Sequence, residues 1–228
     1  METKELKFLA TPEKGDVSAL LVRPRDATHL LVLGHGASTN MRHATLRSIA
    51  ERLADVGIAT FRYNFPYSEN GKGRDSQAVC TATVRSAVKA ASEAAPGLPL
   101  LAGGHSFGGR MTSTAASESP LEGVRGLVFF SFPLHLAGKP ETRRADHLAD
   151  VTVPMLFLSG TRDELAGLDL LRPVCEKLGE RATPHVLDTA DHGYKILKKS
   201  RASDEDVFTE MARVVRDWAA KLASRKPA

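Results

Sequence analysis

The chain has 228 residues, of which 42% are hydrophobic and 25% are charged, and its formal net charge is +4. This length suits one α/β domain, so we expect residues 1–228 to form a single domain. The basic residues are scattered, and no motif for nucleic-acid recognition accompanies them, which argues against nucleic-acid binding. No apolar run is long enough to span a bilayer, and the charged N-terminus lacks a signal-peptide core. We therefore expect a cytoplasmic protein without a membrane partner.

The two cysteines, Cys80 and Cys175, each lie in a segment that predicts an amphipathic helix. Their spacing gives neither a metal-binding pattern nor a disulfide framework. We expect no metal and no cofactor, and the sequence leaves the oligomeric state open.

Predicted strands and helices alternate along the chain. An antiparallel hairpin is expected over residues 5–11 and 17–24, and an uninterrupted apolar strand at 30–33 is typical of a strand buried on both faces. The later elements are a helix at 43–56, a strand at 58–63, a polar loop at 68–75, a helix at 76–94, a strand from 100, a helix ending near 119, a strand at 126–132, an irregular stretch at 133–151 with a short helix around 143–148, a strand at 154–160, a helix to about 178 and a strand at 183–187.

The last predicted helix opens at Ser203, with acidic residues in its first turn that favour a helix N-terminus. Its core-facing stripe should consist of Val207, Met211, Val214, Trp218 and Leu222. The alternation of strands and helices predicts a doubly wound, mostly parallel sheet with helices on both faces. Functional sites in such sheets form at the carboxyl ends of the strands.

The strand that begins at Leu100 runs into the sequence Gly-His-Ser-Phe-Gly at 104–108, and a helix follows. This is the pattern of a nucleophile elbow, in which a strained turn holds a serine hydroxyl above the sheet edge. Glycines are needed on both sides because a Cβ would collide where strand and helix nearly touch. We predict that Ser106 is a nucleophile, which needs a neighbouring base to take its proton.

The chain resembles the α/β-hydrolase superfamily over nearly its whole length. The resemblance rests on the 104–108 motif, the His35-Gly36 turn after an earlier strand, Asp163 and His192, and the order Ser, Asp, His is that of the superfamily. The segments 64–67, 103–111, 132–135 and 160–163 are similar to the compact dienelactone-hydrolase-like branch, which includes testis-expressed and chromatin-complex-subunit-like hydrolases.

The resemblance implies roles for two further side chains. Of the eight histidines, only His192 lies between the last strand and the final helix, where it would act as base and then as acid. Asp163 follows a core strand and would orient the imidazole. Glu164, Asp188 and Asp191 are rival acids, and Asp163 could instead cap a helix.

An oxyanion hole would use the backbone N–H groups of Ala37 and Phe107. Ser38 and Asn40 could add polar contacts there or belong only to a loop. Arg110 either forms a salt bridge within the scaffold, which we favour, or reaches a substrate carboxylate. Tyr67 and His135 either line the pocket or, as we favour, pack near it.

These residues predict a serine hydrolase that cleaves a small-molecule carboxylic ester or related acyl bond through an acyl-enzyme. Serine at the nucleophile position excludes dehalogenase-like members, which need a carboxylate, and dienelactone hydrolases proper, which use cysteine. Only about twenty residues separate the predicted strands at 126–132 and 154–160, so we expect little or no cap domain. The alternatives are a non-catalytic interaction protein with this fold and an acyltransferase that uses the same three residues.

Overall fold

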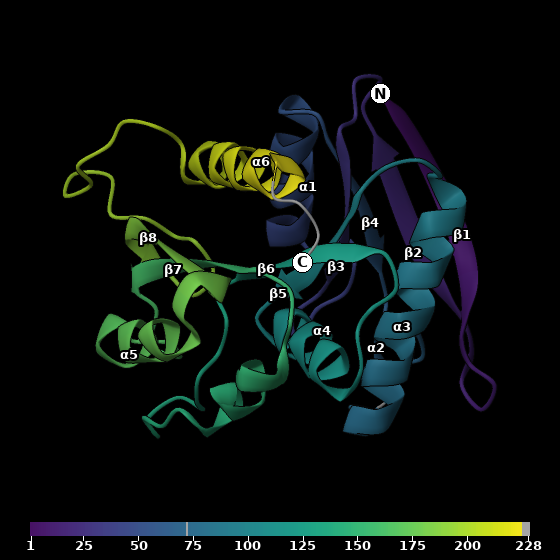
Figure 1. The fold of residues 1–228 in the computed structure, drawn as a ribbon, viewed down its shortest axis with the longest axis horizontal. Coiled ribbons are helices and arrows are strands. Elements are labelled where there is room, and N and C mark those ends of the chain that lie inside the picture. Colours follow the sequence, from purple (N-terminus) through teal and green to yellow (C-terminus); the bar gives the residue numbers. More distant parts are fainter. Residues whose placement is uncertain (72, 225–228) are drawn as a thin grey trace.

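The computed structural model describes residues 1–71 and 73–224. Its centre is an eight-stranded sheet in the order β1-β2-β4-β3-β5-β6-β7-β8 (Figure 1). The strands are β1 Glu2–Thr11, β2 Gly15–Arg23, β3 His29–Gly34, β4 Ile58–Tyr63, β5 Leu100–His105, β6 Val124–Phe130, β7 Met155–Arg162 and β8 Ala182–Asp191. The pairings β1 with β2 and β2 with β4 are antiparallel, and the other five are parallel. The sheet is therefore mostly parallel, as predicted.

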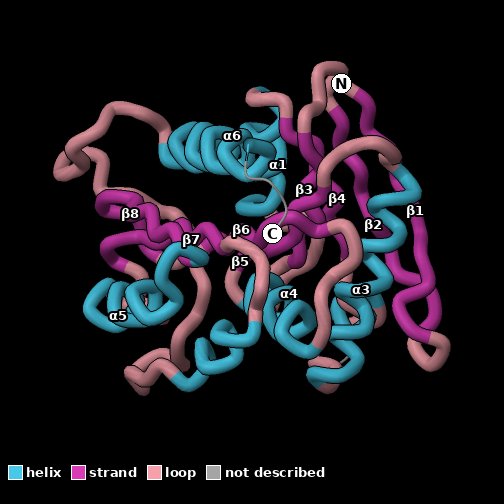
Figure 2. Tube along the Cα trace, viewed as in Figure 1, coloured by secondary structure: helices cyan, strands magenta, loops and turns pink. Residues whose placement is uncertain are grey.

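Helices cover both faces of this sheet. The helices are α1 Ala44–Asp55, α2 Pro66–Glu69, α3 Gln77–Ala94, α4 Phe107–Glu118, α5 Leu168–Leu178 and α6 Val207–Ser224, with 3-10 turns η1 Arg143–Asp150 and η2 Gly179–Arg181. Figure 2 shows α1 and α6 on one face and α3, α4 and α5 on the other. The doubly wound architecture is confirmed.

The central strand β3 explains why its sequence is apolar without interruption. Successive side chains of a strand point to opposite faces. Leu30 and Val32 pack into the core beneath α3, α4 and α5, whereas Leu31 and Leu33 pack into the core beneath α1 and α6. Both faces of the strand are buried, so no polar position remains.

Helix α6 begins at Val207, and the prediction that it opens at Ser203 is wrong. The carboxylate of Asp206 accepts the N–H groups of Phe208 and Thr209, which is the contact of a helix N-cap. Ser203 accepts only the N–H of Glu205 in a local turn before the helix.

The core stripe of α6 was predicted almost correctly. Val207, Met211 and Trp218 are buried. Val215 is also fully buried, whereas Val214 and Leu222 are only partly buried against the same core.

Other boundaries differ from expectation by a few residues. The hairpin strand β1 extends back to Glu2, where it still pairs with Arg23 of β2. Residues 66–69 form the short helix α2, because the fixed φ of Pro66 suits the first position of a helix. The polar loop expected at 68–75 therefore begins after α2. Strand β8 runs on to Asp191, and the loop with His192 starts directly at the sheet edge.

The interval between β6 and β7 holds the 3-10 turn η1 and no inserted helical domain. The expectation of little or no cap is confirmed. Within residues 1–71 and 73–224, no helix has the length and apolarity needed to cross a membrane.

Candidate active site

Ser106 lies in a strained turn between β5 and α4. Its φ of 52° and ψ of −114° place a non-glycine residue in an unfavourable region, at a cost on the order of 1–3 kcal/mol that the surroundings must enforce. A Cβ at Gly104 would lie 2.6 Å from the backbone of Gly108, and one at Gly108 would lie 2.4 Å from the backbone of Gly34. These glycines let β3, β5 and α4 approach closely, and that approach fixes the turn.

His192 follows β8 directly and lies between two polar partners. Its Nε2 is 2.9 Å from Oγ of Ser106, and its Nδ1 is 2.9 and 3.0 Å from the two carboxylate oxygens of Asp163. The Asp163 side chain is fully buried, whereas 24% of the His192 side chain is exposed. The geometry suits an imidazole whose Nδ1–H donates to the carboxylate and whose Nε2 accepts the hydroxyl proton.

Two of the three rival carboxylates, those of Asp188 and Asp191, have other hydrogen-bond partners. Asp188 Oδ2 accepts the N–H of Ala202 at 2.9 Å. Asp191 Oδ1 accepts the N–H groups of Gly193 and Lys195, both at 2.9 Å. Both side chains therefore shape the loops that follow β8.

Asp163 does not cap a helix, so that alternative is wrong. The N-cap position of α5 is Gly167. Asp163 Oδ1 instead accepts the N–H of Leu165 at 2.9 Å. This bond and the bond to His192 hold the carboxylate in one orientation.

His105, the residue before Ser106, secures the loop that carries His192. Its Nε2–H donates to the backbone carbonyl of His192 at 3.0 Å. Burial lowers the pKa of His105 to about 4, which keeps the ring neutral with one donor. Sequence reasoning could not find this role of His105, because a contact across 87 residues leaves no local signal.

The predicted oxyanion groups come from two different segments. Phe107 is the first residue of α4, and Ala37 lies in the loop after β3. Neither N–H donates to an acceptor within residues 1–71 and 73–224. Both groups therefore remain available for an anion, and the positive end of the α4 dipole lies at Phe107.

The loop that carries Ala37 is secured by His35, which is fully buried. Its Nδ1–H donates to the carbonyl of Gly36 at 2.7 Å, and its Nε2 accepts the N–H of Phe65 at 3.1 Å. Burial lowers the pKa of His35 to about 4. One neutral ring thus joins the loop after β3 to the segment after β4, where the sequence indicated only a turn.

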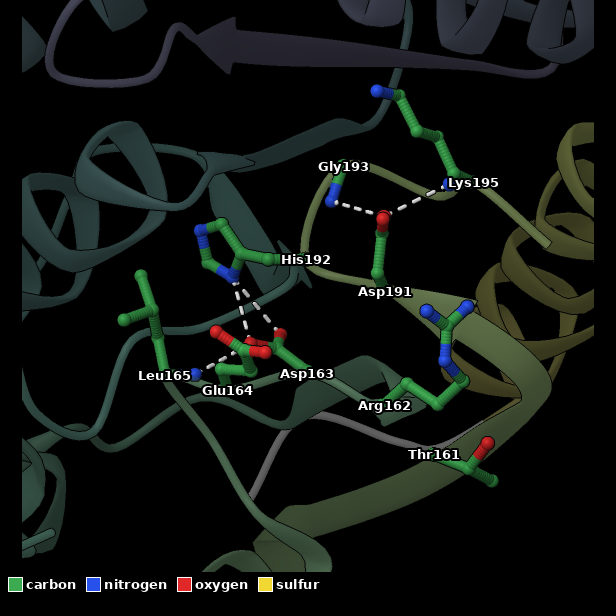
Figure 3. Close-up of a pocket in the computed structure, with 9 residues that line it drawn as sticks. All are labelled: Thr161, Arg162, Asp163, Glu164, Leu165, Asp191, His192, Gly193 and Lys195. Atoms are coloured by element: carbon green, nitrogen blue, oxygen red, sulfur yellow. Dashed lines mark hydrogen bonds and ion pairs between the residues drawn. The ribbon is translucent and has the colours of Figure 1, made fainter. Parts of the chain in front are cut away.

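A cavity of about 730 Å³ opens beside the imidazole and the carboxylate (Figure 3). It lies on the Asp163 side of His192, and Ser106 is not among its lining residues. Its walls carry charges of both signs, from Arg162, Glu164 and Lys195. Within the part of the chain that the structure describes, no group of three or more His, Cys, Asp or Glu side chains could hold a metal ion.

The accessory candidates differ in their contacts. Tyr67 is buried and stacks on Phe65 with the ring centroids 6.0 Å apart. His135 is also buried. Asn40 accepts a backbone N–H within its own loop, whereas Ser38 is exposed.

Arg110 does not form the predicted scaffold salt bridge. Its guanidinium has no ion pair or hydrogen bond with any residue in the described ranges.

Comparison with known families agrees with this architecture. A family model described as "Alpha/beta hydrolase domain" matches residues 27–220. Among solved structures, a dienelactone hydrolase from Anabaena variabilis ATCC 29413 superposes with a TM-score of 0.75 at 19% identity, covering 97% of this chain and 99% of that one. XC6422 from Xanthomonas campestris, described as an a/b serine hydrolase without lid, superposes with a TM-score of 0.73 at 18% identity, covering 100% and 98%.

Est1E from Butyrivibrio proteoclasticus is similar at a TM-score of 0.70 and 15% identity, covering 97% of this chain and 99% of that one. At identities this low, the superpositions establish a shared fold and nothing further. The family match confirms the resemblance to the α/β-hydrolase superfamily, and the superposition with the dienelactone hydrolase shows a similar fold.

Proposed function

The chain belongs to the alpha/beta hydrolase domain family, and on that premise we propose that it is a serine hydrolase that cleaves a carboxylic ester or related acyl bond through an acyl-enzyme. One observation carries the proposal. The imidazole of His192 lies within hydrogen-bond distance of both Ser106 Oγ and the buried carboxylate of Asp163. A serine hydroxyl becomes a nucleophile at neutral pH only with such a base beside it.

In the first step, Nε2 of His192 takes the hydroxyl proton as Ser106 Oγ attacks the acyl carbon. The new imidazolium is stabilised by Asp163, which keeps Nδ1–H as donor. Negative charge develops on the former carbonyl oxygen, where the N–H groups of Ala37 and Phe107 would stabilise it. The imidazolium then protonates the leaving alcohol, and the acyl group stays on Ser106.

In the second step, water takes the place of the alcohol. His192 removes a proton from the water, which attacks the acyl carbon, and returns that proton to Ser106 as the ester bond breaks. The products are a carboxylic acid and the free enzyme. This cycle needs no metal or cofactor. Cytoplasmic residence and a small-molecule acyl substrate remain parts of the proposal.

Reaction with a fluorophosphonate probe tests the nucleophile directly. Native protein should be labelled at one serine, and Ser106→Ala should abolish the label. Ser119→Ala, at an exposed position at the end of α4, is the matched control and should label normally. Absence of labelling in native protein would exclude the catalytic proposal and favour a non-catalytic role for the fold. Labelling that survives in Ser106→Ala would show that another residue is the nucleophile.

A further inference from the structure

Arg110 lies one helical turn after the proposed nucleophile on α4. Its backbone N–H donates to the carbonyl of Ser106 at 3.1 Å. Long side chains of a helix lean towards its N-terminus, and the guanidinium carbon of Arg110 lies 5.8 Å from the centre of the Phe107 ring. The cation is therefore directed back towards the turn that carries Ser106 and the Phe107 N–H.

A second cation lies on the same ring. The guanidinium carbon of Arg74, from the loop before α3, is 5.0 Å from the centre of the Phe107 ring. Like Arg110, Arg74 has no carboxylate partner within the described ranges. Two arginines thus share one aromatic side chain, and neither forms an ion pair with a carboxylate of the described residues.

The half-buried Arg110 also lines a cavity of about 400 Å³ between α4 and η1. Arg143 and Arg144 line this cavity from η1, and among its described lining residues Glu141 is the only carboxylate. Glu141 is already engaged by Arg143, with 3.0 Å between Nε and Oε2. The lining therefore carries three arginines against one glutamate, which leaves a net positive charge.

The other polar groups of the cavity do not compensate this charge. Arg144 donates to the backbone carbonyl of His135 at 3.1 Å, which fixes its position without neutralising it. His147 is 2.7 Å from the hydroxyl of Ser113. Burial, and after it the charges of Arg144 and Arg74, lowers the pKa of Arg110. An anion placed here would relieve this repulsion.

We propose that Arg110 and Arg144, with Arg74 at the rim, form a subsite for an anionic group of the substrate, a carboxylate or a phosphate. The proposal rests on the proposed function, because it places that group beside the reacting ester. The favoured substrates are esters or related acyl compounds that carry an anion several atoms from the scissile bond. The planar guanidinium of Arg110 would bind two oxygens of that anion at once.

The anion could lie on the acyl part or on the alcohol part, and two matched substrate pairs distinguish these cases. The acyl pair is 4-nitrophenyl hydrogen adipate and its neutral methyl ester. The alcohol pair is 4-acetoxybenzoate and its neutral methyl ester. The value of kcat/KM is measured for all four in wild type, Arg110→Gln, Arg110→Lys and Arg47→Gln. Arg47 is an exposed arginine on α1, on the other face of the sheet, and controls for loss of one charge.

In one of the two pairs, Arg110→Gln should lower kcat/KM for the charged member by about tenfold or more, the effect of losing a charge-assisted hydrogen bond. Its neutral partner should change by less than about threefold, and Arg110→Lys should recover part of the loss. Arg47→Gln should affect both members equally. The responding pair identifies the side of the substrate that carries the anion. Equal losses for charged and neutral members in both pairs would overturn the proposal.

A binding measurement separates failure of the subsite from failure of the proposed function. If wild type hydrolyses none of the four esters, titration calorimetry with adipate and with inorganic phosphate at low ionic strength still tests the subsite. Arg110→Gln should weaken binding of at least one of these anions by about fivefold or more relative to Arg47→Gln. Equal affinities in the two variants, or no binding to wild type, would overturn the proposal.

Discussion

Both carboxylate oxygens of Asp163 lie close to Nδ1 of His192, at 2.9 and 3.0 Å, although the two residues follow different strands. β7 and β8 are adjacent and parallel, so their carboxyl ends meet at one edge of the sheet. This register brings together two side chains that are 29 positions apart.

The first prediction concerns this carboxylate. Asp163→Asn should lower kcat about 10⁴-fold, because an amide favours the wrong imidazole tautomer and does not stabilise the imidazolium. Asp188→Asn removes the same charge from a residue that holds the N–H of Ala202, and should cost less than about tenfold. Ester hydrolysis by the two variants is compared with wild type. A larger loss in Asp188→Asn would assign the acid to that residue.

The second prediction concerns the nucleophile and its base. Ser106→Ala and His192→Ala should each lower kcat by about three to six decades, the range seen when members of a catalytic triad are removed. Hydrolysis of 4-nitrophenyl acetate provides the measurement, and Ser119→Ala should stay close to wild type. A loss below about tenfold in either triad variant contradicts the assigned role.

The neighbourhood of Ser106 could be predicted because its geometry needs particular residues in a short stretch. Close approach of β5 and α4 requires glycine at 104 and 108, and a buried parallel strand requires the apolar run before them. The resemblance to the α/β-hydrolase superfamily, with its order Ser, Asp, His, then implied Asp163 and His192. Their proximity is now a structural fact, whereas their chemical roles remain predictions.

Features built from distant segments could not be predicted in the same way. The contact of His105 with the His192 carbonyl depends on how two loops meet. That Arg110 has no ion-pair partner among the described residues depends on what α3 and η1 place beside it. The start of α6 was misread for a local reason, since Ser203 and Asp206 are both good capping residues and only the fold selects Asp206.

The third prediction concerns the crossing of β3 and α4. A methyl group added at Gly108 would lie 2.4 Å from the backbone of Gly34, and backbone cannot move aside as a side chain can. Gly108→Ala should therefore lower the free energy of unfolding by about 3 kcal/mol or more. Gly73→Ala, where nothing lies within 4 Å of the added atom, should change it by less than about 0.5 kcal/mol. Urea denaturation checks both, and similar values would refute the packing argument.

The fourth prediction concerns the dependence of stability on pH. Burial lowers the pKa of His35 and of His105 from 6.5 to about 4. Between these values the unfolded chain binds protons that the folded chain does not, so the free energy of unfolding must decrease as the pH falls from about 6.5 towards 4. Each ring should account for a loss of about 2 kcal/mol between pH 7.5 and 5.

Urea denaturation of wild type at pH 7.5, 6.5, 5.5 and 5.0, followed by the fluorescence of the buried Trp218, measures this decrease. His105→Gln removes one of the two rings and should reduce the decrease by about 2 kcal/mol, whatever its stability at pH 7.5. Val215→Ala, which removes buried apolar atoms and no titrating group, should be less stable at every pH but keep the wild-type pH dependence. If His105→Gln also keeps the wild-type pH dependence, proton binding to His105 does not differ between the folded and unfolded chain, and its neutral role in holding the His192 loop must be abandoned.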